Sequence, residues 1–146
     1  MKNHKTLENL EKTLATSYAL ALKTQNYHWN VVGGNFKSLH ELFGSQYEEL
    51  FDAIDEIAER IRALGSKVEG SFENFSKVSM IKSGNKNFNN NEMLKDLIAD
   101  HEILINFMKK AIKTSQDEED EATADMFIGR VEVHEKAAWM LNSSIS

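Results

Sequence analysis

The chain has 146 residues, of which 41% are hydrophobic and 27% are charged, and this length predicts one domain, residues 1–146, because a second core would not fit. It contains no proline and only 7 glycines, which disfavours sandwiches and barrels with their frequent turns and favours an all-α fold. The absence of cysteine excludes disulfides, thiolate metal sites and cysteine nucleophiles, and the formal net charge of −6 disfavours phosphate polyanions as partners.

Two long helices are predicted in the first part of the chain. Apolar residues three and four positions apart predict a first helix from about Thr6 to Val31. The pair Gly33–Gly34 ends it, because adjacent glycines weaken helix propagation and supply the left-handed conformations that a tight turn needs. The longest apolar stripe then runs from Phe36 to Leu64 and stops at Gly65, which predicts a rod about 43 Å long, with Gly44 as a weak point inside it.

A long crossover is predicted to follow, since residues 66–90 lose the apolar rhythm and collect Ser, Gly, Lys and Asn, with a short helix around Ser71 to Val78. A third helix is predicted to begin after Asn91, which we interpret as its N-cap. The acidic run Asp117 to Glu121 separates it from a fourth helix, which carries Leu141 and is expected to end in the polar tail Asn142 to Ser146. Four long helices with one crossover after the second predict a ferritin-like four-helix bundle.

Histidines and carboxylates are the candidates for chemistry. No HExxH pattern occurs, which excludes the helical zinc-protease arrangement, and no ExxH pattern occurs, which excludes a di-iron site built within one chain in the usual way. We interpret His4 as a solvated residue near the N-terminus. His101 and His134 lie in mid-helix beside acidic residues, and for both a hydrogen-bonded structural role is favoured over metal ligation.

His28 and His40 lie near the facing ends of the first two helices, where the glycine turn would bring their imidazoles together. Asp55 and Glu59 are four residues apart and therefore share a helix face, and two imidazoles with two carboxylates suit Fe(II), Mn(II) or Zn(II). His40 and Asp55 are 15 residues apart, about 22 Å along a continuous helix, so one chain cannot close this site. An antiparallel pair of second helices about a two-fold axis would close it. The alternative is a polar seam, with Glu59 in a surface ion pair.

The segments NYHWNVVGGNFKSLHELF and YEELFDAIDEIAERIRALG closely resemble the Dps family of mini-ferritins, and a weaker likeness continues through TADMF and HEKAAWML. The resemblance implies a bacterial cage of twelve ferritin-like subunits with ferroxidase centres at the two-fold interfaces. The residues that carry it are His28, Trp29, Asn30, Gly33, Phe36, His40, Phe43, Asp55, Glu59, Arg60 and Gly65.

The resemblance also implies residue roles. His28 and His40 of one subunit, with Asp55 and Glu59 of its partner, would hold iron, and Glu59 would bridge two metal ions. The implied reaction is oxidation of Fe(II) to Fe(III) by hydrogen peroxide, with dioxygen slower, followed by storage of ferric oxyhydroxide and protection against oxidative stress; Zn²⁺ or Mn²⁺ would be substitutes for iron. Trp29 would lie beside the centre, either absorbing stray oxidising equivalents or packing as a core aromatic.

One position departs from the family pattern. Gly44, four residues after His40, stands where many relatives carry an acidic side chain, so we expect tight binding at one iron position and weak or oxidant-dependent binding at the other. The run Asp117 to Glu121 and Asp125 would focus cations at a three-fold axis, although a solvated loop at a helix N-terminus is the alternative. Asp125 is the favoured member because it lies in TADMF. The expected iron-uptake pore residues are Asp117, Asp120 and Asp125.

Two other functions compete with iron oxidation. Members of the Dps family often condense DNA through Lys-rich tails, and a non-enzymatic nucleoid protein is the second hypothesis. Here only Lys2, Lys5 and His4 are available, and twelve chains would carry a formal charge of about −72, so DNA binding is expected to be weak or absent and lost with salt. A structural bundle without metal is the third hypothesis. No apolar run approaches the roughly 20 residues that span a bilayer and MKNHKTLENLEK is not signal-like, so we expect a cytoplasmic protein without a membrane partner.

Overall fold

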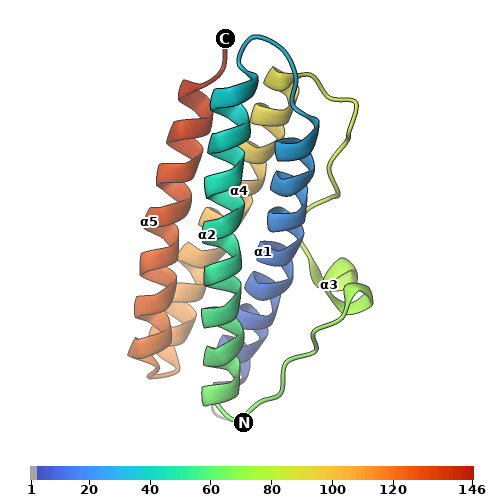
Figure 1. The fold of residues 1–146 in the computed structure, drawn as a ribbon. Helices are drawn as coiled ribbons and strands as arrows, with labels where there is room; N and C mark the ends of the chain where they lie inside the picture. The colour runs from blue at the N-terminus through green and yellow to red at the C-terminus, as the bar shows by residue number, and fades with distance from the viewer. Residues whose placement is uncertain (1–2) are drawn as a thin grey trace.

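A computed structural model describes residues 3–146 of the chain. These residues form helices and turns without any strand, and four long helices run side by side while a short one lies outside them against the first (Figure 1). The predicted all-α bundle with a short extra helix in its crossover is confirmed. The helices are α1 (His4–Asn30), α2 (Phe36–Ala63), α3 (Phe72–Val78), α4 (Asn90–Asp117) and α5 (Glu121–Ser143).

The crossover between α2 and α4 decides how the helices pair. It returns along the whole length of the bundle and carries α3 past the side of α1, so α2 and α4 run in the same direction (Figure 1). The close helix pairs are α1 with α2 and α4 with α5, and α1 also packs against α4. Among the helices of residues 3–146, none has the length and apolar composition needed to cross a bilayer.

The predicted N-cap of the third long helix is wrong. The N-cap of α4 is Asn89 and not Asn91, because the Asn89 side chain accepts a hydrogen bond from the backbone N–H of Glu92 at 2.9 Å, while the Glu92 carboxylate accepts one from the Asn89 backbone at 3.0 Å. Only Asn89 stands three residues before a glutamate, which is the spacing that a capping box requires. The last helix ends at Ser143, inside the polar tail where its end is predicted.

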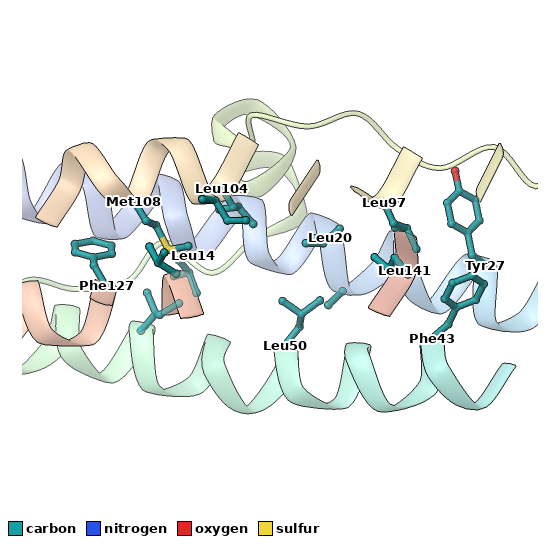
Figure 2. Packing of buried hydrophobic residues seen from close by; sticks show 14 of the residues in the cluster. Leu14, Leu20, Tyr27, Phe43, Leu50, Leu97, Leu104, Met108, Phe127 and Leu141 are labelled. Carbon is teal, nitrogen blue, oxygen red and sulfur yellow. The ribbon is translucent and has the colours of Figure 1, made fainter. Parts of the chain in front are cut away.

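The core is a column of large apolar side chains that α1, α2, α4 and α5 direct towards the bundle axis (Figure 2). Leu20, Leu50 and Leu104 are completely or almost completely buried near its middle, and Tyr27 and Phe43 close one end. Burying one such side chain contributes about 1.5–3 kcal/mol to the free energy of folding. The heptad-like spacing of these residues therefore holds each helix straight against its neighbours.

A buried histidine pair joins α4 to α5. His101 Nδ1 lies 2.8 Å from His134 Nδ1, and Arg130 Nη2 donates a hydrogen bond of 2.9 Å to His134 Nε2. Both imidazoles are at most 2% exposed, in agreement with the predicted structural role. Burial, and then the charge of Arg130, lower the pKa of His101 to about 4. Burial is also the main cause that lowers the pKa of His134 well below its usual value.

These shifts predict that acid destabilises the fold. Unfolded histidines bind protons below about pH 6.5 whereas the folded pair stays neutral, so the free energy of unfolding should fall by up to about 1.4 kcal/mol per pH unit for each histidine. Burial raises the pKa of Asp100 to about 6, and this group opposes the trend because the folded state binds its proton first. We expect the melting temperature to fall between about pH 7 and about pH 5.

The double substitution His101→Leu, His134→Leu should reduce this fall, and Asp100→Asn should enlarge it. Differential scanning calorimetry at the two pH values measures all three proteins. An unchanged pH dependence in the double variant would show that the histidine pair is not its source.

Candidate metal centre

The turn between α1 and α2 brings two histidines face to face. His28 lies in the last turn of α1 and His40 in the second turn of α2, and their rings stack with centroids 3.7 Å apart and planes inclined by 14°. Gly33 supplies the positive φ of 99° that reverses the chain, which a side chain would resist. Asn90 Nδ2 donates a hydrogen bond of 2.8 Å to the carbonyl of Val32 and so ties this turn to α4. The role of Asn90 was not predicted, because nothing in the run of asparagines distinguishes it.

Reciprocal hydrogen bonds determine which ring nitrogens are available. His28 Nδ1 lies 2.6 Å from the backbone oxygen of His40, and His40 Nδ1 lies 2.7 Å from the backbone oxygen of His28. A carbonyl oxygen only accepts, so both Nδ1 atoms must carry the proton and donate it. The Nε2 atom of each ring then keeps its lone pair, which is the form that binds a metal ion. The backbone thus fixes both imidazoles in the tautomer that a metal ion would require.

Gly44 makes room for one of these rings. A Cβ atom at this position would lie 3.1 Å from Cε1 and 3.2 Å from Nδ1 of His28, closer than ordinary van der Waals contact. The helix is continuous through Gly44, which is buried, so the expected weak point is not visible as a break. Tyr47 meets His28 edge-on with centroids 5.2 Å apart, and Phe36 stacks on His40 at 5.0 Å. The missing side chain is therefore part of how the histidine pair packs.

The carboxylates lie far from the imidazoles of their own chain. Asp55 and Glu59 are exposed on α2, and neither makes a side-chain hydrogen bond or ion pair with any described residue. Arg60, the nearest cation in sequence to Glu59, pairs instead with Asp120 at 3.0 Å. Because α2 is unbroken, His40 and Asp55 stay about 22 Å apart. Within residues 3–146 no three histidine, aspartate or glutamate side chains come together as a metal site.

Trp29 is 60% exposed, so within one chain it is not a packed core residue. Other large apolar side chains are exposed near this end and along the same side of the molecule, among them Leu22 at 50%, Phe36 at 43% and Phe72 at 79%. Exposed apolar groups in such number are typical of a surface that another protein covers.

The acidic run contains residues that hold helices together. Asp120 is the N-cap of α5, since Oδ1 accepts from the Thr123 backbone N–H at 3.0 Å and Oδ2 accepts from the Thr123 hydroxyl at 2.6 Å. Although burial acts in the opposite direction, the hydrogen bonds from Thr123 and the charge of Arg60 hold the pKa of Asp120 below its usual value. Glu118 caps α1 by accepting from the backbone of Thr6 at 2.8 Å. Both carboxylates therefore lie at a helix N-terminus, as in the alternative to a cation pore that the sequence left open.

The other two expected pore residues are exposed. Asp117 ends α4 and lies 3.8 Å from Lys113 in a surface ion pair. Asp125 is exposed on α5 and has no side-chain partner among residues 3–146. Of the three carboxylates, Asp125 is the one that the fold leaves free to meet a cation.

Comparison with known proteins assigns the family. Residues 7–146 match the model of the ferritin-like domain, and the chain is 34% identical over 144 residues to the DNA protection during starvation protein 2 of Bacillus anthracis, covering 99% of both chains. The chain belongs to the Dps family. A low-temperature-induced protein of Nostoc is 44% identical over 138 residues, which are 93% of this chain and 77% of the relative.

The solved structure of a Dps protein from Vibrio cholerae superposes with a TM-score of 0.94 at 28% identity, covering 99% of this chain and 91% of the other. That protein is described as a member of a broad superfamily of ferritin-like diiron-carboxylate proteins. The family resemblance read from the sequence is therefore confirmed, and so is the ferritin-like architecture. Family membership supports a role in iron storage and protection against oxidative damage.

The packing at Gly44 predicts a specific effect of adding one methyl group. Gly44→Ala should weaken Zn²⁺ binding severalfold, because the new Cβ displaces the His28 ring that the hydrogen bond to the His40 carbonyl orients. Gly129→Ala is the matched control: this glycine is also in a helix, and a Cβ there has no neighbour within 4 Å. The Gly129→Ala protein should melt at a slightly higher temperature than the wild type, because alanine favours the helix, and its Zn²⁺ affinity should be unchanged. Isothermal titration calorimetry with Zn²⁺ measures the affinity of each variant, and equal affinities would contradict the prediction.

Proposed function

We propose that this protein is a ferroxidase that oxidises Fe(II) at centres shared between two subunits and stores the ferric product inside a cage of twelve. The observation that carries the proposal is the presence of two separate half-sites, one at the turn between α1 and α2 and the other farther along α2. One end presents two Nε2 lone pairs, from His28 and His40. The other end presents the unpaired, exposed carboxylates of Asp55 and Glu59.

A two-fold axis between antiparallel copies of α2 completes both half-sites at once. The separation of about 22 Å between His40 and Asp55 is the same in each copy, so alignment at one end brings alignment at the other. The exposed Trp29 and Phe72 would be covered by such a partner.

Fe(II) is the substrate of the proposed reaction. The imidazoles of His28 and His40 bind one Fe(II) together with Asp55 of the partner subunit, and Glu59 of the partner subunit bridges to a second Fe(II). Without a side chain at Gly44 the second ion has fewer ligands and binds more weakly. Zn²⁺ and Mn²⁺ suit the same ligands and would compete with iron.

The oxidant accepts two electrons at once. Two Fe(II) and hydrogen peroxide, with two protons, yield two Fe(III) and two molecules of water, and the O–O bond breaks without release of hydroxyl radical. Dioxygen serves as a slower oxidant. The chain contributes ligation and positioning, and exclusion of bulk water, while the ferric ions hydrolyse to an oxyhydroxide that is retained in the cavity. Trp29, beside His28, is placed to donate an electron if a single-electron oxidant forms.

DNA condensation is the second candidate, and the name of the Bacillus anthracis relative refers to DNA protection. Lys2 lies outside the described residues. His4 and Lys5 belong to α1: His4 pairs with Glu8 at 2.9 Å, and the Lys5 backbone N–H donates to Glu118. Two of the three cationic groups expected in a tail are thus held in a helix. With the net charge of −6, this favours weak or absent DNA binding.

Mixing two inactive variants tests the shared centre. One variant carries His28→Ala and His40→Ala, and the other carries Asp55→Ala and Glu59→Ala. Each should be inactive alone, but subunits dissociated, mixed in equal amounts and reassembled should recover about one quarter of the wild-type rate of Fe(II) oxidation, because in each mixed pair one of the two centres receives both intact halves.

Oxidation is followed by absorbance after addition of hydrogen peroxide, and assembly by light scattering. No recovery in a fully reassembled mixture would refute a shared centre.

Zn²⁺ should also raise the melting temperature of the wild-type protein, whereas the melting temperature of a bundle without a metal site would not change.

Asp125 provides a separate test of iron uptake. Asp125→Asn should slow incorporation of Fe(II) severalfold while the cage remains assembled, because a carboxylate that attracts cations is lost. Asp120 is unsuitable for this test, since neutralising it would also remove the cap of α5. Glu73→Gln is the control, because it removes the same single negative charge at an exposed position on α3. Equal uptake rates in the two variants would exclude Asp125 from the path.

A further inference from the structure

Among residues 3–146, Tyr47 of α2 is the tyrosine whose ring contacts the pair formed by His28 and His40. It meets the His28 ring edge-on, with centroids 5.2 Å apart and planes inclined by 70°. The chain has three tyrosines, and the other two, Tyr18 and Tyr27, make their ring contacts with phenylalanines. The proposed function gives Tyr47 no task, although it touches a ligand of the proposed iron centre.

Tyr47 also lies beside the space that Gly44 leaves open. Residues three apart share a helix face, and a Cβ at position 44 would approach the same His28 ring, 3.1 Å from its Cε1. In the proposed centre the missing side chain removes a ligand of the second Fe(II), so at low iron concentration the centre holds one ion. An oxidisable side chain therefore adjoins a ligand of the iron position that fills first.

A centre that holds one Fe(II) is one electron short. Hydrogen peroxide needs two electrons to form two molecules of water, and a single Fe(II) supplies only one, which leaves a hydroxyl radical. A phenol can supply the second electron together with its proton. Phe36, which stacks on His40, cannot replace it, because the phenyl ring is far harder to oxidise.

Trp29 is the other oxidisable ring near the two histidines, but it is placed differently. Consecutive helix residues point in directions about 100° apart, so Trp29 and His28 leave α1 on different faces. The Trp29 side chain is 60% exposed and contacts no aromatic ring among residues 3–146. Within one chain it is therefore Tyr47, half-buried and in ring contact with His28, that is coupled to a proposed iron ligand.

We propose that Tyr47 supplies the second electron when the centre holds one Fe(II), an inference that rests on the proposed function. Fe(II) and Tyr47 each give one electron to hydrogen peroxide, the electron of Tyr47 passing through its contact with His28. The O–O bond breaks, and the phenolic proton with one proton from solvent completes two molecules of water. The other products are Fe(III) and a neutral tyrosyl radical.

The next Fe(II) restores the phenol. It gives one electron to the tyrosyl radical and becomes Fe(III), and a proton from solvent returns to the phenolic oxygen. The two steps together oxidise two Fe(II) with one hydrogen peroxide, as in the proposed reaction. Tyr47 thus allows the two ions to arrive one after the other without release of hydroxyl radical.

Tyr47→Phe removes the electron donor and keeps the ring. The Tyr47 hydroxyl makes no hydrogen bond with a described residue, so its loss leaves no partner unpaired. The ring can keep its contacts with His28 and with Phe51, whose centroid lies 6.1 Å away. Tyr18→Phe is the matched control, because it makes the same chemical change at a ring that contacts neither histidine.

The test uses the assembled protein without dioxygen, loaded with one Fe(II) per centre, mixed with one equivalent of hydrogen peroxide and frozen for EPR spectroscopy. The wild type and Tyr18→Phe should show a tyrosyl radical, whose spectrum narrows when the protein contains ring-deuterated tyrosine. Tyr47→Phe should show severalfold less of this radical and, by spin trapping, release severalfold more hydroxyl radical. Fe(II) added after the peroxide should abolish the wild-type radical.

Absorbance follows Fe(II) oxidation in the same samples and separates this inference from the proposed function. Oxidised iron without a tyrosyl radical, or an unchanged yield of the radical in Tyr47→Phe, would refute Tyr47 as the donor and leave the ferroxidase intact. No oxidation in the wild type would refute both. Tyr47→Phe should bind Zn²⁺ as the wild type does; an affinity that falls in proportion to the lost radical would make Tyr47 a packing residue and overturn the inference.

Discussion

A continuous α-helix holds its residues at distances that packing cannot change, and in this protein that constraint acts on α2. The helix carries His40 near one end and Asp55 and Glu59 towards the other, with no break at Gly44. Each chain therefore keeps its imidazole pair apart from these carboxylates. In the proposed ferroxidase centre a second copy of the same rod would supply the missing ligands at the required spacing, so that symmetry would become part of the chemistry. The proposed ferroxidase centre, and the apolar surface around Trp29 that a partner would cover, both follow from this rigidity.

Buried polar groups recur in the interior of the bundle, and some of them tie one helix to its neighbour. Lys23 of α1 is almost fully buried and lies 3.0 Å from Asp96 and 2.8 Å from Asp100 of α4. The pair His101 and His134 performs the equivalent task between α4 and α5. Removing one member would take a hydrogen bond from a buried group, which is destabilising, although Lys23 would keep one carboxylate if the other were lost and His134 would keep Arg130. These contacts discriminate against other registers of the helices, whereas the leucine column alone would tolerate a shift by a turn.

The same residue types perform different tasks according to the helix ends that they meet. Asp120 and Glu118 satisfy backbone N–H groups at the starts of α5 and α1, whereas Asp125, only a turn further along α5, faces solvent without a partner. Likewise His28 and His40 donate through Nδ1 to carbonyls and keep Nε2 free, while His101 and His134 bond to each other through Nδ1. Composition indicates that such groups are present, and hydrogen bonding decides which of them are available to a ligand.

The sequence by itself determined the helices and their order, since the apolar spacing that defines each helix is local and the paired glycines mark the turn. It also predicted that Asp55 could not join His40 within one chain, because this needs only the rise per residue of a helix, whereas the expected meeting of His28 and His40 depended on the turn at the paired glycines. The predicted N-cap at Asn91 was wrong. Three consecutive asparagines are alike in type, and the hydrogen bonds with Glu92 make Asn89 the cap. Only the tertiary structure decided the protonation of the imidazoles, the packing of His28 against Gly44 and the structural roles of Asp120 and Glu118. These depend on contacts between residues that are distant in the chain, and no local pattern encodes which partner each will find.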